Sequence, residues 1–137
     1  MQWSKLKSRV KRLIEPALAR RIDFHVTSYR ESHDECERGW ITFDGNIVFE
    51  TSWYQHQQGS NELRPQDLGA ALRTYPDLSI DEALNHSDPI IRAFAIVDRR
   101  LGRRRIADIS TESRKHPLID LFYHLRTENK LATELKP

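Results

Sequence analysis

The chain has 137 residues, of which 38% are hydrophobic and 31% charged, and 22 Lys and Arg against 20 Asp and Glu give a net charge of +2. This length fits one domain, residues 1–137, and the three Trp, four Tyr and five Phe argue against general disorder. A single cysteine, Cys36, excludes an intramolecular disulfide framework, and no run approaches the roughly 18 apolar residues that span a bilayer. We therefore expect a cytoplasmic protein without a transmembrane segment.

The N-terminal segment has the periodicity of an amphipathic helix. Apolar residues recur at helical spacing from Trp3 to Leu18, and Ser4 is suited to the N-cap. Pro16 cannot donate to the helical hydrogen-bond ladder, so the helix is expected to break near Glu15 and to continue as a short second piece.

The hydrophobic period then changes to two, which indicates β-strands. Alternation starts at Ile22 and resumes on both sides of Asp44-Gly45-Asn46, a step whose residues tolerate positive φ. We predict a hairpin over residues 39–54. The polar connection 31–38 makes a three-stranded antiparallel meander the simplest topology, with one face covered by the first helix to give the unit 1–54.

The remainder of the chain has helical patterns. A polar loop over residues 55–64 precedes a helical region, residues 65–130, and a tail, residues 131–137. Helix starts are indicated at Pro65, at Ser79 with Glu82 as a capping box, at Asp88 followed by Pro89, and near Pro117. The predicted fold class is α+β: an N-terminal amphipathic helix packed on a three-stranded antiparallel meander, followed by a helical C-terminal region.

Positive charge is concentrated in two places. The first is an arginine run within residues 99–105, made of Arg99, Arg100, Arg103, Arg104 and Arg105. The run follows a periodic apolar segment, and Gly102 is suited to the C-terminal cap of that helix. We therefore expect these cations to interact favourably with the C-terminal end of the helix dipole. The second is the segment 1–21, with seven basic residues against one acidic residue, of which Lys5, Arg9 and Arg12 are binding candidates.

Three interpretations of this charge pattern are open. The preferred one is a non-enzymatic binding or accessory module whose basic face takes an acidic surface of a protein partner. The alternative is nucleic-acid binding through phosphate contacts of the same eight residues. The arginines could instead pair with the acidic connection, which contains Glu31, Asp34, Glu35 and Glu37. The oligomeric state is not indicated.

A small enzyme is the third functional hypothesis. His116, Asp120 and His124 stand at four-residue intervals on one helix face, with Glu128 one turn further, and a histidine beside a carboxylate can act as an acid or base. His33 and Cys36 have the spacing of half a zinc site, with no second pair to complete it. No catalytic residue, no metal site and no cofactor is assigned from these patterns.

Several segments together resemble a family of small uncharacterised bacterial proteins. They are Trp3-Ser4-Lys5-Leu6-Lys7, Gly39-Trp40-Ile41-Thr42, Ile90-Ile91-Arg92-Ala93 through Asp98 to Arg104, and His116-Pro117-Leu118 with Phe122-Tyr123. The resemblance covers nearly the whole chain. It implies a bacterial cytosolic origin and carries no activity, substrate or catalytic residue to these positions.

Overall fold

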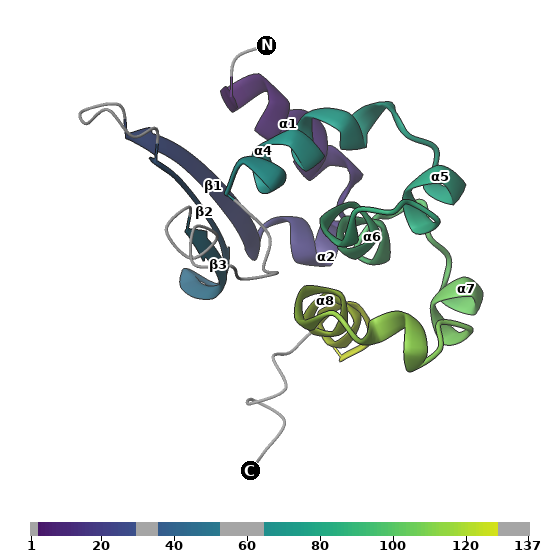
Figure 1. Cartoon of the computed structure of the whole chain (residues 1–137). Coiled ribbons are helices and arrows are strands. Elements are labelled where there is room, and N and C mark those ends of the chain that lie inside the picture. The colour runs from purple at the N-terminus through teal and green to yellow at the C-terminus, as the bar shows by residue number, and fades with distance from the viewer. Residues whose placement is uncertain (1–2, 30–35, 53–64, 129–137) are drawn as a thin grey trace.

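The computed structural model describes residues 3–29, 36–52 and 65–128, and it confirms the predicted α+β class (Figure 1). The N-terminal part contains α1 (Trp3–Leu13), α2 (Pro16–Ala19), β1 (Ile22–Tyr29), β2 (Cys36–Phe43) and β3 (Asn46–Ser52). The helical part contains α4 (Pro65–Thr74), α5 (Ile80–Leu84), α6 (Pro89–Ile96), α7 (Arg103–Ala107) and α8 (Pro117–Glu128), with single 3₁₀ turns at Tyr75–Asp77 and Glu112–Arg114. The predicted loop 55–64 and tail 131–137 fall outside the described residues.

The break at Pro16 is confirmed. The carboxylate of Glu15 caps α2 by accepting a hydrogen bond from the backbone N–H of Ala17 at 3.1 Å. The predicted N-cap at Ser4 is wrong, because α1 has already begun at Trp3. The Trp3 ring packs edge-on against Phe24 of β1, with 6.2 Å between ring centroids, which joins the first turn of α1 to the sheet.

The sheet is an antiparallel meander in the order β1-β2-β3, as predicted. Asp44 and Gly45 form the hairpin turn with φ of 52° and 85°, the left-handed values that this turn requires. A register shift between Ile41 and Thr42 marks a bulge in the β2–β3 ladder. The buried face carries Phe24 opposite Ile41, and it faces the helices.

The core lies between this sheet face and the helical region. Helix α1 contacts the sheet at Phe24, and α4 also lies against β1 and β2 (Figure 1). Phe94 of α6 contacts both Phe24 and Phe122 of α8 in edge-to-face pairs, with centroids 5.5 and 5.3 Å apart. Helix α6 is therefore the central element, buried on nearly all sides between α4, α5 and α8.

The predicted helix starts are confirmed in the helical region. Ser79 and Glu82 form both hydrogen bonds of the capping box, and Asp88 caps α6 through the backbone N–H of Ile90 at 2.9 Å. Helix α8 begins at Pro117. Within the described part of the chain, no helix combines the length and the apolar character needed to cross a membrane.

Candidate binding site

The arginine run does not continue the preceding helix. Helix α6 ends at Ile96, and Gly102 is the N-cap of α7 rather than the C-cap of α6, so Arg103 opens a new helix. The predicted role at the C-terminus of α6 is therefore wrong for the whole run, because α6 is capped at Val97 and has no basic residue in its last turn. Glycine is common at both ends of helices, so the sequence pattern is compatible with both, but the extended backbone of Gly102 fits the N-cap and not the left-handed C-terminal cap.

The segment between α6 and α7 is joined to the N-terminal helices. Ile14 and Asp98 form an isolated antiparallel bridge, flanked by hydrogen bonds from the backbone N–H of Glu15 to Val97 O at 2.8 Å and from that of Arg99 to Leu13 O at 2.7 Å. This pairing fixes the start of the arginine run beside the α1–α2 junction.

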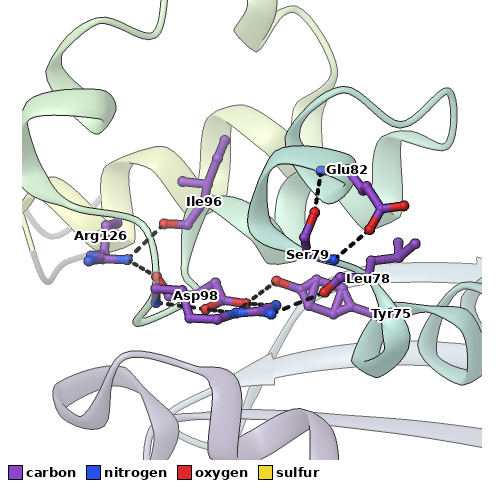
Figure 2. A network of polar contacts seen from close by, with 8 residues as sticks. Tyr75, Leu78, Ser79, Glu82, Ile96, Asp98 and Arg126 are labelled. Atoms are coloured by element: carbon purple, nitrogen blue, oxygen red, sulfur yellow. Dashed lines mark hydrogen bonds and ion pairs between the residues drawn. The ribbon is translucent and has the colours of Figure 1, made fainter.

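A buried polar network, the Asp98 network, holds the same segment from the other side. The Asp98 side chain is fully buried and accepts hydrogen bonds from Tyr75 Oη at 2.5 Å and from Arg100 Nε and Nη2 at 3.0 and 2.8 Å (Figure 2). Arg100 also donates to Leu78 O at 3.0 Å. Burial, with the Asp98 carboxylate adding to it, raises the pKa of Tyr75 far above its usual value, so the phenol remains a proton donor.

Arg126 of α8 completes this junction. Its Nη1 donates to Ile96 O at 3.1 Å and Asp98 O at 2.7 Å (Figure 2). Its Nη2 donates to Leu101 O at 2.7 Å. These carbonyls follow the end of α6, where backbone acceptors lack helical partners. Burial lowers the pKa of Arg126, with partial compensation from Glu15 and Asp98.

The remaining members of the run lie at the surface. Arg99, Arg103 and Arg104, here called the exposed arginines, form no ion pair with any residue that the structure describes. Arg105 pairs with Asp81 of α5 at 2.6 Å, but both side chains are largely exposed. Pairing with the acidic connection, predicted as an alternative, concerns side chains outside the described residues.

The candidate cations of α1 border a shallow groove on the outer face of that helix. The groove is lined by Ser4, Lys5, Ser8, Arg9 and Arg12. Arg9 forms an ion pair with Asp77 at 3.1 Å, and Arg12 Nε donates to Ser8 O at 3.3 Å. This groove and the arginine run are separate parts of the surface, joined through the backbone pairing at Leu13 and Arg99.

An open cleft of about 640 Å³ lies where α2, α7 and α8 meet. It is lined by Glu15, Ala17, Arg103, Ile106, Ala107, Tyr123, Arg126 and Thr127. Of the predicted binding residues it contains Arg103. Sequence reasoning did not single out Arg126, because its three acceptors lie 25 to 30 residues earlier and leave no local pattern.

The histidines considered for catalysis lie elsewhere. His116 Nδ1 accepts from the backbone N–H of Leu118 at 3.2 Å, and burial lowers its pKa, with Arg92 adding to the effect. His124 lies between Asp120 and Glu128 at 3.5 and 3.3 Å on a partly exposed face. These contacts are those of a helix start and of surface pairs, and neither histidine lines the cleft.

No metal-binding group of three or more His, Cys, Asp or Glu side chains occurs among the residues that the structure describes. The His33 to Cys36 candidate lies outside them, because His33 and the side chain of Cys36 are not described.

Comparison with known proteins places the chain in a family. Neither the curated proteins nor the solved structures gave a match. The model of the SF0329 protein family matches residues 2–68 and residues 55–127, which together cover most of the chain. This match supports the resemblance to a small uncharacterised family, and the chain therefore belongs to the SF0329 protein family.

Proposed function

We propose that this protein is a non-enzymatic binding module of the bacterial cytoplasm, and that its exposed arginines bind an acidic surface of a protein partner. The observation that carries the proposal is the division of the arginine run. Arg100 is bound to Asp98, whereas Arg99, Arg103 and Arg104 are exposed without an ion pair in the described structure.

Helix stability does not account for the exposed arginines, and among the described residues ion pairing does not account for them either. Helix α7 has five residues, so its dipole is small, and Arg103 lies at its first residue, where the dipole does not favour a cation. Exposed guanidinium groups, in contrast, can form paired hydrogen bonds with carboxylates of another molecule. Arginine is also enriched among the residues that dominate protein interfaces.

The surroundings of the exposed arginines favour a protein over a nucleic acid as the partner. Carboxylates are interspersed among them: Asp81 beside Arg105, Glu15 in the cleft and the exposed Asp108 after α7. A phosphate backbone presents closely spaced like charges, which these carboxylates repel. A protein surface can present both signs of charge in a matching arrangement.

Affinity capture with charge-reversed variants tests this proposal. The variant carries Arg103→Glu and Arg104→Glu, and the matched control carries Arg73→Glu and Lys115→Glu, which change two other exposed cations by the same total charge. Each tagged protein is incubated with lysate of the cell that encodes it, with and without nuclease, and retained proteins are identified.

We expect one stoichiometric protein to be retained by the wild type and the control, to survive nuclease, and to be lost from the variant. Reconstituted binding of the purified pair should weaken at higher salt, since the interaction is electrostatic. Equal retention by variant and control would contradict the proposal, as would capture that nuclease abolishes.

Nucleic-acid binding is the second candidate function, and the groove on α1 favours it. Two hydroxyl groups, Ser4 and Ser8, alternate there with Lys5 and Arg12, which is a donor arrangement suited to successive phosphate oxygens. A labelled oligonucleotide would then bind with an affinity that falls linearly on a log–log plot against salt. Lys5→Glu with Arg12→Glu should abolish that binding, and salt-independent or absent binding would exclude this function.

A further inference from the structure

The cleft between α2, α7 and α8 has the size of a small-molecule site. Its volume of about 640 Å³ falls within the range of roughly 300 to 1,000 Å³ that is typical of ligand pockets. Its lining comes from three separate elements, which the junction around Val97–Leu101 holds together. The walls are therefore set by the packed structure rather than by a single loop.

Arg126 lines this cleft and has hydrogen-bond donors that its contacts with the described residues do not use. Of its five N–H groups, the three hydrogen bonds to carbonyls use two on Nη1 and one on Nη2. The N–H of Nε and the second N–H of Nη2 have no acceptor among the described residues. The side chain is half-buried and fixed by its three carbonyl acceptors, so these two donors are held in place before any ligand arrives.

A second guanidinium group lies in the same cleft. Arg103 lines it and is close enough to Arg126 for the two charges to repel, which contributes to the lowered pKa of Arg126 after the larger effect of burial. Two like charges in one concave site are stabilised by an anion placed between them. Two guanidinium groups in the lining of one cleft are a combination suited to binding an anion.

The third charged group in the lining selects the kind of anion. Glu15 contributes a carboxylate, so two cations and one anion leave the lining one positive charge in excess. A single carboxylate neutralises that charge, whereas a phosphate dianion would leave the lining and ligand together with a net negative charge. A carboxylate also matches the planar donor pairs of guanidinium groups.

The rest of the lining indicates which group the ligand carries beside its carboxylate. Ala17, Ile106 and Ala107 provide an apolar floor, and the hydroxyl groups of Tyr123 and Thr127 offer additional polar contacts. A small apolar side chain or acyl chain attached to the carboxylate would cover this floor.

The geometry points to the cleft as a binding site for a carboxylate attached to a small apolar group. Arg126 and Arg103 would bind the carboxylate. This site shares Arg103 with the surface proposed above for the protein partner, but it is defined by the cleft and by Arg126 rather than by that partner. The carboxylate can come from a free small acid or from the C-terminal residue of a peptide, since both present the same group.

The test uses NMR titration of the full chain labelled with ¹⁵N, with N-acetyl-leucine as the probe and N-acetyl-leucinamide as the uncharged control. We expect N-acetyl-leucine to shift the Nε–H signal of Arg126 and the amide signals of Ile106 and Thr127 in a saturable manner, and the amide to leave them in place. Equal shifts from both compounds, or none from either up to about 10 mM, would overturn the proposal.

Two matched variants show whether the cleft or the general charge is responsible. Arg103→Gln removes a cation that lines the cleft, and Arg104→Gln removes the neighbouring cation that does not. We expect Arg103→Gln to weaken binding at least tenfold and Arg104→Gln to change it less than twofold. Equal effects would overturn the site, as would inorganic phosphate that displaces N-acetyl-leucine at lower concentration than acetate does.

A tetrapeptide ending in a free leucine, compared with its C-terminal amide, distinguishes the two sources. Binding of the free-ended peptide at least tenfold tighter than N-acetyl-leucine supports the site with a peptide terminus as its ligand. If the free-ended peptide binds no tighter than N-acetyl-leucine, the result supports the site with a free small acid as its ligand. Binding of the peptide amide as tight as that of the free-ended peptide would overturn the carboxylate site.

Discussion

Members of the arginine run differ in their contacts although they lie within seven residues of one another. Arg100 donates to the fully buried Asp98 and belongs to the core junction, whereas Arg103 and Arg104 are exposed on α7. Identical side chains thus serve folding at Arg100 and are available for binding at Arg99, Arg103 and Arg104. A charge cluster in a sequence must therefore be divided by the contacts of each side chain before a function is assigned to it.

The largest expected difference is in stability. Arg100→Met leaves the buried Asp98 carboxylate without its cation, and we expect it to lower the free energy of unfolding by about 3 kcal/mol. Arg104→Met removes an exposed cation and should change stability by less than about 0.5 kcal/mol. Urea unfolding of both variants measures the difference, and equal stabilities would contradict the structural role of Arg100.

Tyr75→Phe examines the other hydrogen bond to Asp98. The substitution removes the phenolic donor while keeping the ring in its buried position beside Phe94. We expect a loss of about 2 kcal/mol, because the acceptor is charged and water cannot readily replace the donor. A stability equal to that of the wild type in urea would show that Arg100 alone satisfies Asp98.

Acid should weaken the packed part and leave the charge of the arginine run intact. Burial lowers the pKa of His116 below its ordinary value of 6.5, so the unfolded chain binds this proton more readily than the folded one. Stability should therefore fall as the pH drops below 6.5, by at most about 1.4 kcal/mol per pH unit for this group. Urea unfolding at pH 5.5 and 7.5 measures it.

The control for this pH effect is His116→Gln, which should flatten the dependence in part. His25, whose pKa is also lowered by burial and then by Lys7, contributes the same sign and remains. If the stability of His116→Gln depended on pH as steeply as that of the wild type, groups other than His116 would be responsible for the loss of stability in acid.

The smallest expected effect is at Arg105, which is paired but exposed. Its ion pair with Asp81 lies in solvent, so Arg105→Met should lower stability by less than about 0.5 kcal/mol. This result would group Arg105 with the exposed arginines. A loss of stability comparable to that of Arg100→Met would instead show that Arg105 of α7 also stabilises the fold.

Local features of the fold could be predicted from the sequence because their causes act within a few residues. Pro16, the Asp44-Gly45 turn and the Ser79–Glu82 capping box each constrain only their neighbours. The end of α6 was misplaced because Gly102 suits either kind of helix cap. At that position the pairing of Asp98 with Ile14, distant in sequence, decided the outcome.

The candidate site was predictable only in part. The basic composition of the run drew attention to Arg103, which lines the cleft. The Tyr75–Asp98 hydrogen bond spans 23 residues, and Arg126 reaches across 25 to 30 residues to its acceptors. Such contacts have no spacing signature, since tertiary packing alone brings the partners together.

The most direct test of the divided arginine run is the NMR spectrum of the arginine Nε–H groups at neutral pH and low temperature, with hydrogen-exchange rates measured for each. The account predicts a slowly exchanging signal for Arg100, whose Nε donates to Asp98 at 3.0 Å, and rapid exchange for Arg99, Arg103 and Arg104. Similar exchange rates for Arg100, Arg103 and Arg104 would contradict the division on which the proposed function rests.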